Sequence, residues 1–165
     1  MRATIVFEES IGKKSISKLI SKIEIYLATE VDGIDLYFSS IGGEADFAYV
    51  LIDFINLNKD KIDLKLYGNI FSAGSWIAKN CKCKKEFLPE IKLMIHTANI
   101  NDGTFKDINK KHNSSTWAVS ESNQKTNLEF INNIKEYLLP EEINLYNNDE
   151  DVYIIDQERI KKILT

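Results

Sequence analysis

A serine stands in a run of small residues where an expected strand gives way to an expected helix. Ser72 follows the alternating segment 61–67 and Gly68, and it precedes Ala73 and Gly74, after which an apolar helical pattern begins. A hydroxyl beside the unpaired N–H groups of a helix start is well placed to attack a carbonyl, and those groups can stabilise the oxyanion that forms. The same stretch also fits a helix capped by Ser72, with glycines in a tight turn. By itself the stretch leaves both interpretations open.

Other residues with possible catalytic roles lie on both sides of this serine. Gly42 and Gly43 follow an expected strand, and a glycine pair lets backbone approach a substrate closely. His96 ends an apolar run, while the other histidine of the chain, His112, lies in a polar segment and is assigned to the surface. A lone histidine at the end of an apolar strand is usually structural. The glycine pair and His96 therefore indicate a catalytic site only when their spacing to Ser72 is considered.

Hydrophobic periodicity predicts the elements that must position these residues. Strand-like runs alternate with helical spacing three times, and such crossovers make a parallel sheet covered by helices. No G-x-G-x-x-G fingerprint and no Walker-type loop is present. The expected strands are 3–8, 34–38, 61–67, 86–88, 91–95 and 151–155, and the expected helices are 13–29, 45–55, the segment from 73, 128–138, 140–148 and the segment to 164 that Asp156 would cap.

Composition limits the class of protein. A chain of 165 residues predicts a single domain over 1–165, and a net charge of −4 argues against general nucleic-acid binding. Cys81 and Cys83 form neither a disulfide framework nor a zinc site, which fits a reducing compartment. No signal peptide and no membrane-length apolar run is visible. We therefore expect a soluble, cytoplasmic protein without a cofactor, a metal or a membrane partner.

Four segments resemble the proteolytic subunit of the Clp protease. The strand ending in Ser40-Ile41-Gly42-Gly43 resembles that family's S-P-G-G, residues 68–74 its G-x-x-x-S-x-G, Met94-Ile95-His96 its M-I-H, and the segment from Asp151 its D-x-F-[LM]-S. The interval from Gly43 to Ser72 matches the family's without a gap, and that from Ser72 to His96 is one residue shorter. Each motif alone is weak, whereas several in the right order are specific.

The resemblance covers nearly the whole chain and implies a fold and an activity. It implies a crotonase-like ββα superhelix with a protruding handle, here at about 97–138, and assembly into a homo-oligomeric ring. It also implies a serine endopeptidase acting on peptides or unfolded protein. In that role Ser72 is the nucleophile, His96 the general base, and the N–H groups of Gly43 and Ala73 form the oxyanion hole.

The acid that would orient His96 has two candidates. The match to D-x-F-[LM]-S places Asp151 at the acid position. Aligning Asp156 with the family's helix-capping serine instead places Val152 there, and Asp149 becomes the nearby substitute. Both alignments stay open at this point.

The chain departs from the family's pattern in three places. Ile41 replaces a proline, and Thr97-Ala98 replaces Gln-Pro after the histidine. Only Met1 and Arg2 precede the first strand, where the family carries an N-terminal segment that forms axial loops. Because those loops help engage the unfolding ATPase, their absence argues against partnership with a Clp-type ATPase.

Two other functions fit parts of the pattern. The run Ser72-Ala73-Gly74-Ser75-Trp76-Ile77-Ala78 resembles the nucleophile motif of signal-peptide-peptidase-like serine hydrolases, which use a lysine base and usually a membrane anchor. A catalytically inactive assembly protein of the same fold would need no reactive Ser72. Within the run Ser75 is not favoured as the nucleophile, because it lies nearly one helical turn inward.

Overall fold

The computed structural model describes residues 1–97 and 128–165, which form two compact units. Unit 1 comprises Met1–Ile95 and Val152–Thr165, and unit 2 comprises His96–Asp151. Each unit is described by itself. Most of the predicted handle at 97–138, including His112, lies outside the described residues, so the handle and the single domain stay predictions.

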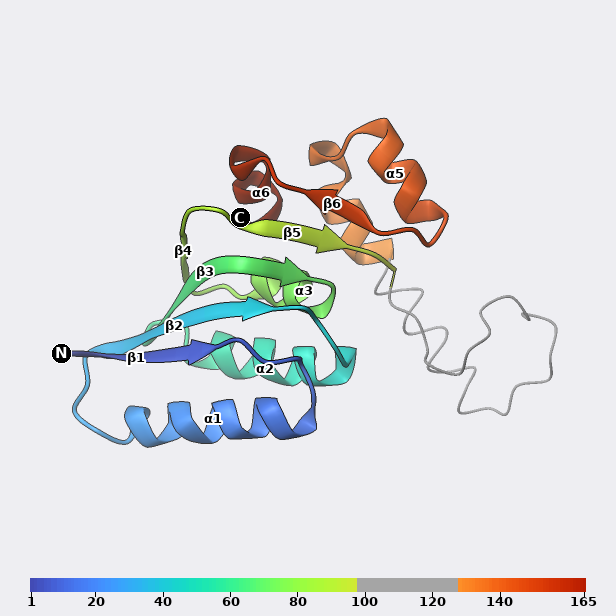
Figure 1. Ribbon diagram of the computed structural model, residues 1–165. Helices are drawn as coiled ribbons and strands as arrows, with labels where there is room; N and C mark the ends of the chain where they lie inside the picture. Colours follow the sequence, from blue (N-terminus) through green and yellow to red (C-terminus); the bar gives the residue numbers. More distant parts are fainter. Residues whose placement is uncertain (98–127) are drawn as a thin grey trace, which may run out of the picture. The chain divides into compact units, whose positions relative to one another are not determined.

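Unit 1 is built on a mostly parallel sheet, as the repeated strand–helix pattern predicts. The strands follow the order β1-β2-β3-β5-β6, with β4 also paired to β3, and only the β5–β6 pair is antiparallel within the described residues. Figure 1 shows β1, β2, β3 and β5 side by side. The strands are β1 (Arg2–Phe7), β2 (Gly33–Ser40), β3 (Ile62–Phe71), β4 (Lys84–Phe87), β5 (Lys92–Ile95) and β6 (Val152–Ile154).

Helices connect the strands and cover the apolar face of the sheet. α1 (Lys13–Leu27) links β1 to β2, α2 (Ala45–Leu57) links β2 to β3, and α3 (Ala73–Asn80) follows β3 directly. Along β2 and β3, alternate residues are buried, which is the period expected of strands covered on one face. The buried set on these two strands includes Ile34, Leu36, Phe38, Ile62, Leu64 and Leu66.

The predicted end of the third strand was wrong. β3 does not stop at Tyr67 but continues to Phe71, because residues 69–71 pair with β5 while the earlier part of the strand pairs with β4. The strand passes Gly68 at φ +59°, where the register with β2 shifts. A glycine that reads as a strand end is therefore a bulge within a longer strand.

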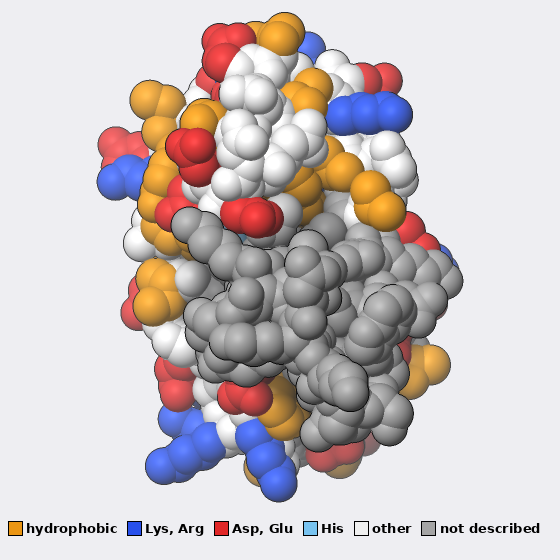
Figure 2. All heavy atoms as spheres, turned by 90° about the vertical axis from the view of Figure 1, so that its right-hand side faces the viewer, with side chains coloured by type: hydrophobic (Ala, Val, Ile, Leu, Met, Phe, Trp, Pro, Cys, Tyr) orange, Lys and Arg blue, Asp and Glu red, His pale blue; other side chains and the backbone are white. Residues whose placement is uncertain are grey.

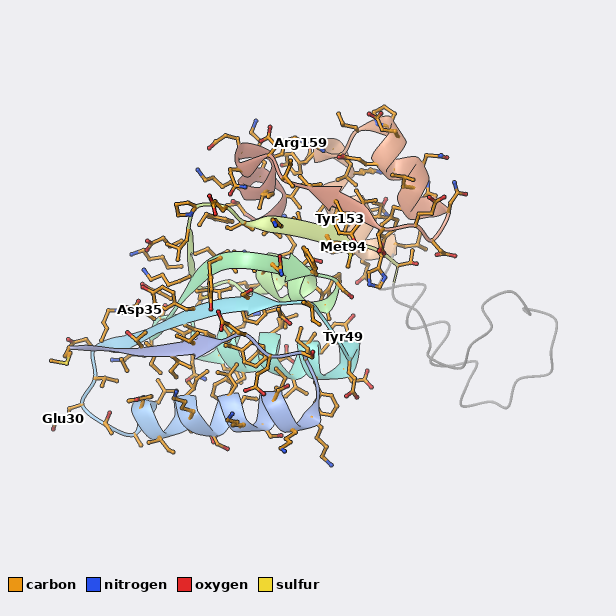
Figure 3. All side chains as sticks on the ribbon, in the orientation of Figure 1. Glu30, Asp35, Tyr49, Met94, Tyr153 and Arg159 are labelled. Atoms are coloured by element: carbon orange, nitrogen blue, oxygen red, sulfur yellow. The ribbon has the colours of Figure 1, made fainter. Side chains whose placement is uncertain are left out.

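The other face of the sheet carries a charged row at the start of the strands. Arg2 Nε donates to Asp35 Oδ1 at 3.0 Å, and Arg2 Nη2 lies 3.2 Å from Asp63 Oδ2, so one guanidinium ties β1 to β2 and β3. Lys65 extends the row to Glu86 on β4. Figure 3 labels Asp35 among the side chains of this sheet. The charges of this row are thus paired with one another. Figure 2 presents a different side of the molecule, on which acidic, basic and hydrophobic side chains are all visible.

Unit 2 is partly described. Residues 128–134 are helical, and the single helix predicted over 128–138 was too long, because a 3₁₀ turn, η1 (Lys135–Tyr137), replaces its last part. α5 (Pro140–Asn147) starts with proline at its first turn, as predicted, and the Leu139 N–H donates to Glu142 Oε2 at 2.8 Å.

The last helix of unit 1 also follows the sequence prediction. α6 (Gln157–Leu164) is capped by Asp156, whose Oδ1 accepts from the Arg159 N–H at 2.9 Å. Among the residues that the structure describes, no helix has the length and apolar character needed to cross a membrane.

Candidate active site

The end of β3 is shaped by a polar contact with β2. At the Gly68 bulge, the Ser39 hydroxyl accepts from the Asn69 N–H at 3.1 Å and lies 3.2 Å from the Asn69 carbonyl. One side chain of β2 therefore replaces the ladder bonds that the bulge removes. This contact sets the path of the last three strand residues, and hence the position at which Ser72 leaves the sheet.

Ser72 adopts a backbone conformation that side chains normally avoid. Its φ is +52° and its ψ is −122°, between the last residue of β3 and the first of α3. A non-glycine residue in such a region costs about 1–3 kcal/mol and persists only where the surroundings impose it. The side chain makes no capping hydrogen bond to α3, so the helix-cap interpretation of Ser72 was wrong.

Hydrogen bonds on both sides of Ser72 impose this conformation. The Ser72 N–H donates to the Met94 carbonyl of β5 at 2.8 Å. The Ser72 carbonyl accepts from the Ser75 N–H at 2.9 Å and from the Ser75 hydroxyl at 2.6 Å. The sharp strand-to-helix turn is thus fastened to the sheet before the serine and to the helix after it.

The glycine pair after β2 lies against this turn. A side-chain carbon placed on Gly42 would be 2.6 Å from Ser72 Cβ and 3.1 Å from Ser72 Oγ. At Gly43 such a carbon would be 2.1 Å from the Ile11 carbonyl oxygen. Both glycines have positive φ, +96° and +146° respectively. Glycine is needed at both positions, once for contact with Ser72 and once for contact with the loop after β1.

The two peptide groups that carry the Gly43 and Ala73 N–H groups are each held through their carbonyl oxygen. The Gly42 carbonyl accepts from the Ile11 N–H at 2.8 Å, and because a trans peptide directs its C=O and N–H oppositely, the Gly43 N–H points away from Ile11. The Ser72 carbonyl is held by Ser75, so the Ala73 N–H likewise points away from α3. Within residues 1–97 and 128–165, neither N–H meets a hydrogen-bond acceptor.

Unit 1 therefore places Gly42, which precedes the predicted donor Gly43, against Ser72, and the predicted donor Ala73 directly follows Ser72. Two backbone N–H groups flanking a serine hydroxyl, one of them at a helix start, can stabilise negative charge on a carbonyl that the hydroxyl attacks. The second unit carries the remaining predicted residues.

His96 opens unit 2, and its ring is engaged locally. Nδ1 lies 2.6 Å from the Thr97 carbonyl oxygen. Because a carbonyl only accepts, this contact requires a proton on Nδ1. A neutral histidine that acts as a base through Nε2 would use this tautomer.

The two candidate acids occupy different positions at the end of unit 2. Asp149 has φ +60°, and its Oδ1 accepts from the Thr97 hydroxyl at 2.6 Å. Asp151 directly precedes β6, in which Val152 pairs with Ile95 of β5. The alternative alignment treats Asp156 as the helix cap, and Asp156 does cap α6. The same alignment puts Val152 at the acid position, but Val152 is buried and its side chain cannot ionise.

The far end of α3 is fastened by a lysine. Lys85 Nζ donates to the Lys79 carbonyl at 3.2 Å and to the Leu164 carbonyl at 2.7 Å, so one ammonium binds the carboxyl ends of α3 and α6. Burial lowers the pKa of Lys85 and raises those of the neighbouring thiols of Cys81 and Cys83. Buried thiols of this kind are inert packing groups. In the described parts of the chain, no group of three or more metal-ligating side chains is placed to hold an ion.

Comparison with known proteins assigns the class of the molecule. The family model described as Clp protease matches residues 1–127. The chain belongs to the Clp protease family, and its α/β architecture is that of the ClpP/crotonase-like fold, as the motifs predict. A search of curated proteins found no match.

Sequence reasoning missed the residues that hold the site in shape. Ser39, Ser75 and Ile11 make the contacts described above, and the buried Ser40 hydroxyl accepts from the Gly42 N–H at 3.1 Å and donates to the Glu9 carbonyl at 3.0 Å. The only signal in the sequence was the concentration of small hydroxyl residues beside the glycines. Such residues are also common in ordinary turns.

Proposed function

We propose that this chain is a serine-type endopeptidase that cleaves peptides or unfolded protein through an acyl-enzyme. The supporting observation is the strained backbone of Ser72, with Gly42 packed against it. Family membership supports the same reaction class.

In the proposed reaction, Ser72 Oγ attacks the scissile carbonyl carbon while its proton passes to Nε2 of His96. The carbonyl oxygen becomes an oxyanion and accepts from the Gly43 and Ala73 N–H groups. The C–N bond then breaks, the leaving amine takes the proton from His96, and an acyl-Ser72 ester forms. Water, deprotonated by His96, attacks the ester and releases the acid, which restores the serine.

Chain connectivity supports the role of His96. The Ser72 N–H is bonded to the Met94 carbonyl, and His96 follows Met94 by two residues in the chain. The tautomer set by the Thr97 carbonyl supports it as well.

The β5–β6 register supports Asp151 as the acid. Leu93 pairs with Ile154 and Ile95 with Val152, so one further step of the ladder would set His96 opposite Asp151. Directly opposed residues of an antiparallel pair project from the same face. We therefore propose that Asp151 is the acid that stabilises the His96 imidazolium, with Asp149 as the alternative.

We further propose that the active form is a homo-oligomeric ring, as is general in this family, and that residues 128–138 contribute to its contacts. Native mass spectrometry of the intact chain tests the assembly, and a strictly monomeric protein at micromolar concentration contradicts it. Whether a Clp-type ATPase binds such a ring is tested by adding one during size-exclusion chromatography.

A fluorophosphonate probe tests the activity directly. Its phosphorus is attacked by a reactive serine, fluoride leaves, and the label stays on the oxygen. We expect labelling of the wild type and of Ser17→Ala, an exposed serine of α1, but not of Ser72→Ala. His96→Ala should label at least about 10²-fold more slowly.

Two other results of the labelling experiment would contradict parts of this proposal. Full-rate labelling of His96→Ala would contradict the histidine base and favour a lysine-based, signal-peptide-peptidase-like site. No labelling of the wild type, whatever its oligomeric state, would overturn the peptidase proposal in favour of a non-enzymatic assembly protein.

A further inference from the structure

The two proposed oxyanion peptides are anchored through their carbonyl groups, but by different means. The Gly42 carbonyl is held by a backbone N–H, that of Ile11, at 2.8 Å. The Ser72 carbonyl is held in part by a side chain, because the Ser75 hydroxyl donates to it at 2.6 Å. Only the second anchor depends on residue type.

Ser75 is a buried residue of α3. Its exposed fraction is 1%, and it lies between Gly74 and Trp76 at the third position of the helix. A hydroxyl in such a place needs a partner, and the Ser72 carbonyl is the partner it has. The bond is the shortest of three that converge on this carbonyl, the others being the N–H groups of Ser75 at 2.9 Å and Trp76 at 3.3 Å.

The anchored carbonyl and the proposed oxyanion donor belong to one rigid group. The peptide between Ser72 and Ala73 is planar, so fixing the direction of its C=O fixes the direction of its N–H. This peptide also follows a residue at φ +52°, where relaxation toward an ordinary backbone conformation would rotate it. A bond that opposes the rotation keeps the Ala73 N–H aimed at the reacting oxygen.

We propose that Ser75 is a positioning residue for the oxyanion hole, acting through the Ser72–Ala73 peptide. The inference rests on the proposed peptidase function, and it gives the serine that was set aside as a nucleophile a separate role. Ser75 touches no reacting atom. Its loss should weaken stabilisation of the oxyanion without changing how the ground-state substrate binds.

The test is the inactivation kinetics of the fluorophosphonate probe on the full chain, separated into kinact and KI. The phosphonyl oxygen gains negative charge as Ser72 attacks, so it reports on the oxyanion hole. We expect Ser75→Ala to lower kinact about tenfold with KI unchanged, which is less than the about 10²–10³-fold loss for removing a donor outright. Ser75→Thr, which keeps the hydroxyl, should restore most of the rate.

A control with the same hydrogen-bond spacing lies just after α1. The Thr29 hydroxyl donates to the Tyr26 carbonyl at 2.7 Å, which is the same three-residue reach as that from Ser75 to Ser72. Thr29→Ala should leave kinact and KI at wild-type values. If Ser75→Ala does not fold, Ser75→Cys keeps a similar volume with a weaker donor and should show the same loss of kinact.

The outcomes separate the two proposals. A wild type that does not label overturns the peptidase function itself. A wild type that labels, with folded Ser75→Ala or Ser75→Cys reacting at the wild-type kinact, overturns the role of Ser75 alone. A rise in KI with kinact unchanged also contradicts it, because that pattern belongs to ground-state binding.

Discussion

Gly42 and Ser72 lie in direct contact: a side-chain carbon on Gly42 would be 2.6 Å from Ser72 Cβ and 2.9 Å from the Phe71 carbonyl oxygen. These residues are 30 positions apart in sequence and follow the ends of two neighbouring strands, β2 and β3. Gly42, in the turn after β2, therefore leaves room for Ser72, the proposed nucleophile, because it has no side chain.

Gly42→Ala should damage both the site and the fold. The added carbon meets Ser72 and backbone, and alanine is strained at φ +96°. We expect a loss of about 1–3 kcal/mol in the free energy of unfolding, measured by chemical denaturation, together with loss of probe labelling. Gly12→Ala is the control, because the nearest atom there, 3.0 Å away, is the movable carboxylate of Glu44. Equal labelling of Gly42→Ala and the wild type would show that this contact does not shape the site.

Asp151→Asn and Asp149→Asn should separate the two acids. The β5–β6 register points to Asp151, whereas Asp149 accepts from the Thr97 hydroxyl. We expect Asp151→Asn to lower the labelling rate by about 10²–10⁴-fold, because the imidazolium loses its counter-charge. Asp149→Asn should retain the rate within about threefold. The reverse order would transfer the acid role to Asp149, and two near-normal rates would show that the Thr97 carbonyl alone orients His96.

The thiols should be unreactive in the folded chain. Burial raises the pKa values of Cys81 and Cys83, so little thiolate exists at pH 8. A thiol reagent such as DTNB should modify neither within minutes under native conditions, and both of the chain's 2 cysteines in denaturant.

The raised pKa values of Cys81 and Cys83 also predict how the free energy of unfolding changes at alkaline pH. Above the pKa of an unfolded thiol, about 8.5, the unfolded chain releases protons that the folded chain retains, so the free energy of unfolding should fall as pH rises. Replacing both cysteines with alanine should reduce this dependence between pH 8 and 10. An unchanged slope would mean that other groups dominate it.

Asp156→Ala should destabilise α6 through loss of its cap. The Asp156 carboxylate accepts from the Arg159 N–H at 2.9 Å, and removing such a cap costs about 1 kcal/mol. Glu158→Ala in the same turn is the control, because its exposed pairing with Lys161 is worth no more than about 0.5 kcal/mol. Equal destabilisation of the two variants by urea would contradict the capping role.

Sequence reasoning predicted the strand–helix order of unit 1 because burial on one face leaves a clear period. It misplaced the end of β3, since Gly68 breaks the alternation while the pairing of residues 69–71 with β5 is a long-range contact that no local pattern records. It also overextended the helix over 128–138, where apolar spacing continues through a 3₁₀ turn.

At the candidate site, the motifs identified residue types and spacing but not backbone geometry. The φ of Ser72 depends on bonds from Met94 and Ser75, one of which comes from a different strand. Local propensity would assign this serine to a cap, and tertiary contacts prevent it from acting as one. The hydroxyls that hold the turns at Gly42 and Ser72 are visible in the sequence only as ordinary turn residues.

The β5–β6 pairing has a consequence for how the molecule can vary. The chain departs from the sheet after Ile95 and returns at Val152, its direct partner, so both ends of the intervening segment are held about 5 Å apart. A segment with such closely spaced attachment points can lengthen, shorten or be exchanged with little demand on the strands that carry it. The sheet that holds Ser72 can therefore stay unchanged while residues 96–151 vary in length or sequence.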